Sequence, residues 1–193
     1  WKSAHRFAEI NARAGFFKDV AYRRWNAQSG GIYAEVSETT PPNPYLEVKE
    51  RDIETLSGRQ LTLLNPAYMT RQVHELELET TGRRDHITSL NPLRPENAPD
   101  DWEKFALKSF EQGKTEHISV HMMNGTEHLR LMKPFITEES CLKCHAKQGY
   151  KAGDIRGGIC VSIPMKQYTT VAQRHCIAII AGHSIFWLLG LVG

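Results

Sequence analysis

The residues best placed to do chemistry in this chain are two cysteines and a histidine in its last third. Residues 141–145 read Cys-Leu-Lys-Cys-His. This CxxCH spacing is the attachment motif for c-type haem. Two thiols on adjacent turns reach the two vinyl groups at one porphyrin edge, and the next histidine lies where it can coordinate the iron. The motif predicts one covalent haem c on Cys141 and Cys144, with His145 as proximal iron ligand.

Other interpretations of a CxxC pair fit this sequence less well. A thioredoxin-like pair begins a helix in a βαβ unit, and the sequence indicates no such unit. A zinc knuckle needs two more ligands at close spacing. The next cysteine, Cys160, stands fifteen residues after His145 with no His or Cys beside it. A purely structural thiol pair stays open. Cys160 and Cys176 are expected to be buried free thiols.

Composition and charge exclude several classes of protein. The chain has 193 residues, with 24 Lys plus Arg, 22 Asp plus Glu and a net charge of +2. Such a chain has no overall attraction to nucleic acid, so we expect no nucleic acid partner. Hydrophobic residues make up 40% and charged residues 24%, which is ordinary for a globular protein and unlike a disordered chain. Four cysteines are too few for a small disulfide scaffold.

The elements that must position the CxxCH segment follow from apolar spacing and turn residues. Helices are predicted over 3–28, from Asn65-Pro66 to about 78, and from Asp100 or Asp101 onward. Alternating residues on both sides of Asn124-Gly125 predict a β-hairpin from 117 to 135. Further strands are predicted at 32–36 and 157–163. Short helices mixed with an antiparallel sheet indicate an α+β domain.

The C-terminal segment 176–193 is apolar and contains no charged residue. A membrane-crossing helix needs about 20 mostly apolar residues. This segment of 18 residues, preceded by Arg174 and His175, therefore predicts a C-terminal transmembrane helix in contact with membrane lipid. The alternative is a buried helix of the core. Because haem c is attached outside the cytoplasm, the predicted location is a membrane-anchored domain in the periplasm.

Four stretches carry a resemblance to a known family. They read RRWNAQSGGIYAEVSETTPPNPYL (23–46), LTLLNPAYMTRQ (61–72), HITSLNPLRPENAPDDWE (86–103) and RLMKPFITEESCLKCHAKQGYKAGDIRGGICVSIPM (130–165). The chain resembles the single-haem, c-type, PAS-like periplasmic sensor domains of bacterial membrane signalling proteins. The resemblance implies a PAS-like antiparallel sheet flanked by helices, with haem between the sheet and the CxxCH segment. It also implies that the terminal helix spans the membrane.

The chain is expected to divide into three parts. These are an N-terminal signalling or stalk helix (1–30), a PAS-like c-type haem domain (31–165) and a C-terminal helix entering the membrane (166–193). The two terminal helices can form a dimeric bundle, so a homodimer or a membrane complex is expected.

The second axial ligand decides whether the haem binds a gas or carries electrons. We favour Met69, which lies in the matching 61–72 segment beside Tyr68, a hydrogen-bonding neighbour for the cofactor. His74, His121 and an open position are the alternatives. Methionine ligation raises the reduction potential, whereas an open position permits binding of a small gas.

Arginines are the expected partners of the haem propionates, because a guanidinium binds a carboxylate in a bidentate manner. Arg130 and Arg156 lie in the matching stretch that contains the CxxCH motif, and Arg71 lies in another. A surface or intradomain salt bridge is the alternative role for each of them.

Together these features predict a membrane-anchored haem protein that senses redox state or a small gas. The alternative is a membrane-anchored monohaem electron-transfer cytochrome c, alone or as a subunit of a larger complex. Enzymatic reduction at the haem is the weakest candidate, because no distal acid–base pair is evident. The chain is therefore not expected to be an enzyme.

Overall fold

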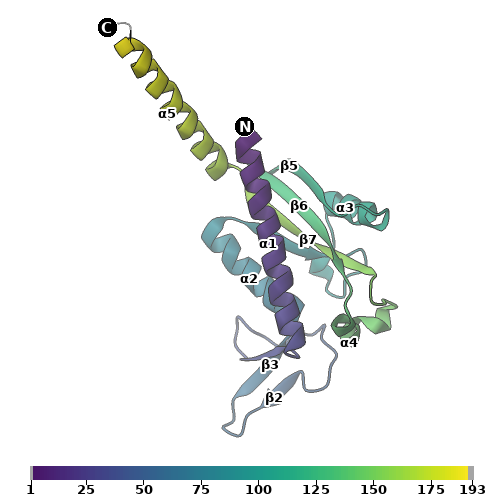
Figure 1. The fold of residues 1–193 in the computed structure, drawn as a ribbon. Helices are drawn as coiled ribbons and strands as arrows, with labels where there is room; N and C mark the ends of the chain where they lie inside the picture. Colours follow the sequence, from purple (N-terminus) through teal and green to yellow (C-terminus); the bar gives the residue numbers. More distant parts are fainter. Residues whose placement is uncertain (1, 191–193) are drawn as a thin grey trace.

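The computed structural model describes residues 2–190, and its strands form two antiparallel sheets accompanied by helices (Figure 1). The elements in chain order are α1 (Lys2–Gln28), β1 (Ile32–Glu35), β2 (Asp52–Glu54), β3 (Gln60–Leu64), α2 (Pro66–Thr81), β4 (Arg84–Thr88), α3 (Asp101–Glu111), β5 (His117–Met123), β6 (Thr126–Ile136), α4 (Leu142–His145), β7 (Ile155–Pro164) and α5 (Lys166–Gly190). Short 3-10 turns lie at Pro95–Asn97, Glu139–Cys141 and Ala146–Gln148. The fold is α+β.

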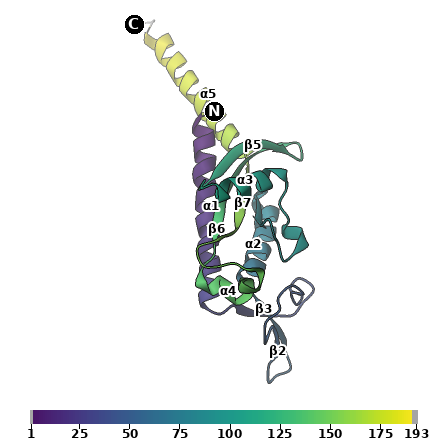
Figure 2. The ribbon, with the colours of Figure 1, turned by 90° about the vertical axis from the view of Figure 1, so that its right-hand side faces the viewer.

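The larger sheet has the strand order β4-β7-β6-β5 and carries helices on both faces. Successive side chains of a strand point to opposite faces. Leu131 of β6 accordingly packs with Ala12 and Phe16 of α1, whereas Met132 packs with residues of α3. Figure 2 shows α1 and α3 on opposite sides of this sheet. The core is thus two layers of side chains, one under each helix.

The smaller sheet has the order β1-β3-β2 and lies at the end of the molecule where α1 finishes (Figure 1). Only β1 was predicted among its strands. The residues of β2 are Asp-Ile-Glu, and three residues are too few to establish an alternating pattern. The sequence-based expectation of a single sheet is therefore corrected to two.

The predicted hairpin is confirmed at its turn. β5 and β6 pair antiparallel, with Met123 opposite Thr126. Asn124 has φ 49° and Gly125 has φ 75°. Two positive φ angles are what the tightest two-residue hairpin turn requires, and Asn-Gly adopts them at low cost.

The predicted C-terminal transmembrane helix is wrong. Among residues 2–190, no helix is both long enough and apolar enough to cross a membrane. Every window of 18 residues within α5 includes Gln173, Arg174, His175 and His183, and these lower its mean hydropathy. Residues 191–193, which complete the predicted segment, lie outside the described residues. The prediction of a membrane-anchored location in the periplasm is corrected with it, whereas lipid contact through this helix stays a prediction.

The alternative of a buried core helix is also wrong for α5. The helix projects away from the sheets (Figure 1), and none of its described residues is buried. Cys176, expected to be buried, is exposed for this reason, whereas Cys160 in β7 is buried as expected. The division of the chain at residues 30 and 165 stays a prediction.

Replacing Leu131 with alanine tests the layer under α1. Leu131 is fully buried between α1 and the sheet, so the change should lower the free energy of unfolding by about 2–5 kcal/mol. Leu56→Ala is the control, because Leu56 lies fully exposed outside both layers and should change stability by less than about 0.5 kcal/mol. Urea titration followed by circular dichroism measures both, and equal losses would contradict this description of the core.

Candidate functional site

The CxxCH segment forms one compact turn that follows β6. The backbone N–H of Cys141 donates to the carbonyl of Glu138 at 2.9 Å, and α4 then carries Cys144 and His145. Both thiols are free and half-buried, and burial raises the pKa of Cys144. Cys141, Cys144 and His145 all line one cavity of about 360 Å³. The structure therefore brings the three predicted motif residues to one site.

The imidazole of His145 is held in one orientation by its neighbours. Its Nδ1 lies 2.8 Å from Oε1 of Gln148 and 3.2 Å from Nε of Arg156. Burial lowers the pKa of His145, and the charges of Arg156 and Arg23 lower it further. Nδ1–H donates to Gln148 in one tautomer, and in the other Nδ1 accepts from Nε–H of Arg156; the shorter contact favours the first. The neutral ring then carries its lone pair on Nε2, which is the state in which histidine binds a metal.

A second cavity of about 430 Å³ adjoins the first. The two share lining residues from α1, α2, β6, α4 and β7, among them Arg23, Ala67, Phe135, Cys144, His145 and Arg156. Both volumes fall in the range of small-molecule sites. The space next to the CxxCH segment is therefore large enough for a bulky ligand.

Two arginines beside His145 have no carboxylate partner within ion-pair distance among residues 2–190. Arg156 donates to the Ser89 hydroxyl at 2.6 Å and lies over the ring of Tyr150 at 4.8 Å. Arg23 lies over Phe135 at 4.6 Å, and its buried Nε has no hydrogen-bond partner. Burial lowers the pKa of Arg23 to about 10 and also lowers that of Arg156. Half-buried cations without a carboxylate partner favour an anionic ligand.

Two further arginines, Arg71 and Arg94, line only the larger of these two cavities. Burial and the neighbouring charge of Arg94 lower the pKa of Arg71. Among the described residues, Glu47 is the one carboxylate that lines the larger cavity. The lining is therefore strongly cationic, and it suits a ligand that carries carboxylates.

Tyr68 and Met69 are adjacent in α2 but differ in their surroundings. Tyr68 lines the larger cavity, and its hydroxyl donates to the carbonyl of Pro41 at 2.7 Å. The sulfur of Met69 lies 3.7 Å from Nδ2 of Asn26, and Met69 lines neither cavity. The structure thus brings Tyr68 to the site and leaves Met69 beside it. Met69 as an iron ligand stays a prediction.

Arg130 lies apart from the CxxCH segment. It is buried near α3, where it pairs with Asp100 at 2.8 Å and Glu103 at 3.2 Å. It also lies over the ring of Trp102 at 4.3 Å and lines neither of the two cavities. Its charge is compensated where it stands, so Arg156 adjoins His145 whereas Arg130 does not. The role of Arg130 stays a prediction.

Comparison with known proteins identifies the family. Residues 8–164 match the model of the Tll0287-like family. The chain belongs to the Tll0287-like family. Among solved structures it is similar to the one titled "Crystal structure of the cyanobacterial heme-protein Tll0287", with 17% sequence identity and a TM-score of 0.50. That match covers 81% of this chain and 94% of the other chain. At this identity the likeness shows the fold alone. No curated protein matches the chain.

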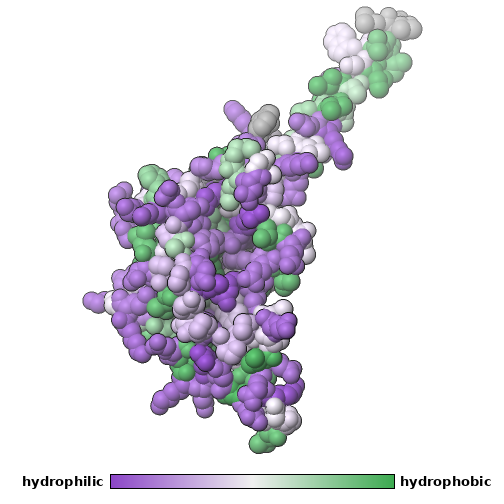
Figure 3. All heavy atoms as spheres, turned by 180° about the vertical axis from the view of Figure 1, so that it is seen from behind, coloured by the Kyte–Doolittle hydropathy of each residue, from purple (hydrophilic) through white to green (hydrophobic). Residues whose placement is uncertain are grey.

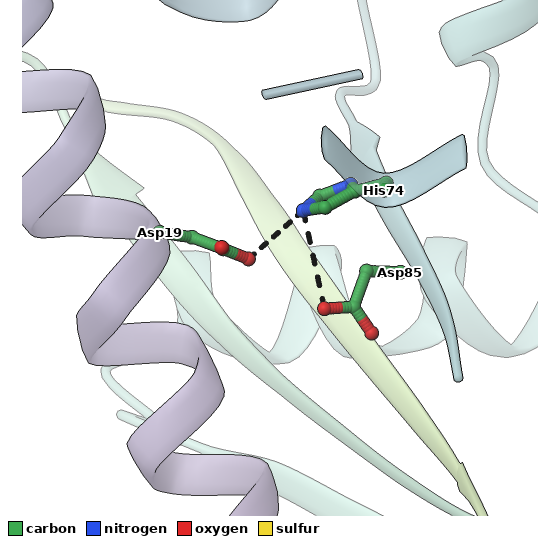
Figure 4. A group of neighbouring side chains, drawn as sticks. All are labelled: Asp19, His74 and Asp85. Carbon is green, nitrogen blue, oxygen red and sulfur yellow. Dashed lines mark hydrogen bonds and ion pairs between the residues drawn. The ribbon is translucent and has the colours of Figure 1, made fainter. Parts of the chain in front are cut away.

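His74 and His121, the alternative ligands, bind other partners in this member of the Tll0287-like family. Nε2 of His74 lies 2.9 Å from Asp19 and 3.9 Å from Asp85 (Figure 4). Nε2 of His121 lies 2.8 Å from the Ser119 hydroxyl, and its ring contacts Trp102. Neither histidine lines a cavity that contains His145.

Asp19, His74 and Asp85 have the composition of a metal site, since their ligand atoms lie within 4.8 Å of one another. Arg83, however, bonds Asp85 and lies 3.8 Å from Asp19. Gly15 of α1 makes room for it, because a Cβ at Gly15 would lie 2.4 Å from Nη2 of Arg83. The guanidinium already supplies a cation to both carboxylates. We therefore interpret the cluster as an ion-pair network that joins α1, α2 and β4.

Several residues of the site were missed from sequence. Arg23 and Arg94 lie in stretches that carried the family resemblance, but an arginine in a helix or loop is usually a surface residue. Gln148 could have been found, because it follows His145 by three residues and a helical turn brings such positions together. Ser89 gave no signal, since its role depends on the pairing of β4 with β7.

Replacing His74 with alanine tests the ion-pair network. The change removes the partner of a buried carboxylate, so it should lower the free energy of unfolding by about 2–5 kcal/mol. Glu75→Ala is the matched control on the same helix. Glu75 is 66% exposed and lies 3.9 Å from Arg71, so its loss should cost less than about 0.5 kcal/mol. Chemical denaturation compares the two variants, and a neutral His74→Ala would refute the network.

Proposed function

We propose that this chain is a c-type haem domain that senses redox state or a small gas through one covalently attached haem. The observation that carries the proposal is that Cys141, Cys144 and His145 line one cavity beside the unpaired Arg23 and Arg156. The similar solved structure is titled a haem protein, which supports the same cofactor here. The proposed role is ligand binding and not enzymatic catalysis.

Each residue of the CxxCH segment has a distinct part in this proposal. The thiols of Cys141 and Cys144 would add to the two vinyl groups as thioethers, and Nε2 of His145 would hold the iron. Gln148 keeps the other ring nitrogen protonated through its 2.8 Å contact, which fixes the tautomer. Bound haem supplies a redox couple and an iron position for a further ligand.

The arginines lie at two ends of the space that the two adjoining cavities form. Haem propionates lie at the porphyrin edge opposite the vinyl groups. Arg71 and Arg94 line the larger cavity but not the one that contains Cys141, so they are suited to the propionates. Arg156, which lines both, adds a third cation. Arg130 is not included, because it lines neither cavity and is bound by Asp100 and Glu103. Arg71 and Arg94 also have acidic neighbours, Glu75 at 3.9 Å and Glu96 at 3.1 Å, but those carboxylates are largely exposed.

An open sixth position is the arrangement that the lining favours. Among the described residues of both cavities, His145 is the one imidazole and there is no methionine. Met69, His74 and His121 each contact other groups. An open position supports sensing over simple electron transfer. The sheet beneath α1 would then serve as the PAS-like scaffold of the sensor.

Covalent attachment is the first test. Protein produced with a c-type maturation system should keep haem after acid–acetone extraction, and its mass should increase by one haem. Cys141→Ala combined with Cys144→Ala should abolish the increase because no thioether can form. Cys176→Ser is the control, since this exposed thiol lies outside the site and its loss should leave the haem attached. Unmodified mass in the unaltered chain would refute the proposal.

The sixth position is tested by absorption spectra with carbon monoxide. The ferrous protein should bind it, because no side chain has to be displaced. Met69→Ala should leave the ferric spectrum unchanged. Conversion to high spin in that variant would make Met69 the ligand, as the sequence suggested. Six-coordinate spectra in both oxidation states that do not respond to the gas would instead favour an electron-transfer cytochrome.

A further inference from the structure

Helix α1 carries two apolar faces, and only one of them is covered. The covered face packs Ala8, Ala12 and Phe16 against the larger sheet. On the other side, Phe7, Ile10, Ala14, Phe17 and Ala21 are all exposed. We refer to these five residues as the outer seam. The large side chains Phe7, Ile10 and Phe17 are 62%, 53% and 59% exposed.

The spacing of the outer seam is that of helix pairing. Its members follow one another at intervals of three, four, three and four residues. This repeat places them in a narrow stripe along the helix, as the a and d positions of a coiled coil. A helix that only covered its own sheet would need one stripe. The second apolar stripe therefore indicates that α1 also packs against another helix.

We infer that α1 pairs side by side and parallel with α1 of a second copy of this chain through the outer seam. An identical helix matches the seam in length and period, and the pairing closes with two-fold symmetry. Together with Trp25, which is 57% exposed, the outer seam offers an accessible surface area on the order of 500 Å² per copy for burial. Two copies reach the roughly 1,000 Å² that a specific interface needs.

Two cations beside the outer seam, Arg13 and Lys18, do not oppose this pairing, and an exposed third, Arg6, can direct its long side chain to solvent. Arg13 is paired with Glu9 at 3.3 Å and with Glu116 at 2.6 Å. Lys18 is paired with Glu77. Each of these cations is compensated within its own copy. Two copies can therefore approach without uncompensated repulsion from these residues.

The parallel orientation follows from the position of α5. Asn11 of α1 donates to the hydroxyl of Tyr168 at 3.0 Å, so α5 begins beside the N-terminal half of α1. It then extends beyond that end (Figure 1), and Figure 3 shows apolar surface along it. Ile177 and Ile180 are among its exposed apolar residues. Parallel pairing places both α5 helices at one end, where they can cover each other. Antiparallel pairing would place the two α5 helices at opposite ends of the dimer, where they cannot cover each other.

Sedimentation of the full chain tests the pairing. The unaltered protein should be a dimer at micromolar concentration. Phe17→Glu should raise the dissociation constant by about 30-fold or more, because a charge enters the centre of the seam. Leu56→Glu is the matched control, since Leu56 is exposed but lies between β2 and β3. Circular dichroism verifies that both variants are folded. A monomeric unaltered chain, or equal effects of both variants, would overturn the inference.

Cysteine cross-linking tests the orientation. In a parallel pair each Ala21 faces its counterpart, whereas in an antiparallel pair Ala21 faces Phe7. Ala21→Cys in a Cys176→Ser background should therefore form a disulfide-linked dimer under mild oxidation, because facing positions lie within disulfide reach. Ala152→Cys, in an exposed loop, is the control and should not cross-link. The parallel arrangement would be overturned if Ala21→Cys formed no cross-link, including the case in which Ala14→Cys forms one and Ala21→Cys does not.

Discussion

The packing of α1 across the larger sheet is the interaction on which the rest of the structure depends. Alanines at positions 8 and 12 are fully buried, so the helix lies close to the strands. That contact fixes the direction of a helix of 27 residues. It places Asp19 in the ion-pair network, Arg23 at the cavities and the outer seam on the free surface. One helix therefore contributes to the core, the candidate site and the proposed interface.

Charge compensation separates Arg83 and Arg130 from the two arginines beside His145. Arg83 and Arg130 are each bound by carboxylates of this chain. Arg23 and Arg156 are half-buried, yet the described residues offer them no carboxylate within ion-pair distance. Burying a cation without a partner is costly. Arg23 and Arg156 both lie beside His145 without such a partner. An anionic cofactor in the cavities would supply the negative charge that compensates them.

Local signals in the sequence were sufficient where structure depends on neighbouring residues. Asn65 and Asp100 were expected near helix starts, and each caps its helix through a side-chain oxygen. The hairpin turn followed from two residues alone. The CxxCH motif named three residues that the structure places around one cavity. In each case the determining contacts span four residues or fewer.

The features that could not be predicted from the sequence depend on contacts between segments far apart in the chain. β2 is too short to show a pattern, and its pairing with β3 is visible only in the fold. His74 was a candidate ligand because histidine commonly binds iron. In the fold its Nε2 instead contacts Asp19, which belongs to α1, a helix distant in sequence. Met69 failed to reach the cavities for a related reason, since α2 turns its sulfur toward Asn26. The apolar tail was misjudged because its polar flank lies within the same helix.

The location of Arg23 gives the proposed sensor a physical connection between its parts. Arg23 lines the cavities, and Phe17 of the outer seam lies six residues earlier on the same helix. At 1.5 Å per residue these positions are about 9 Å apart along the axis. Oxidation or reduction of a bound cofactor changes the charge that faces this guanidinium. Because α1 is continuous and packed against the sheet, a displacement at Arg23 would be shared by the seam. The same helix that closes the cavity would thus carry its state to the second copy.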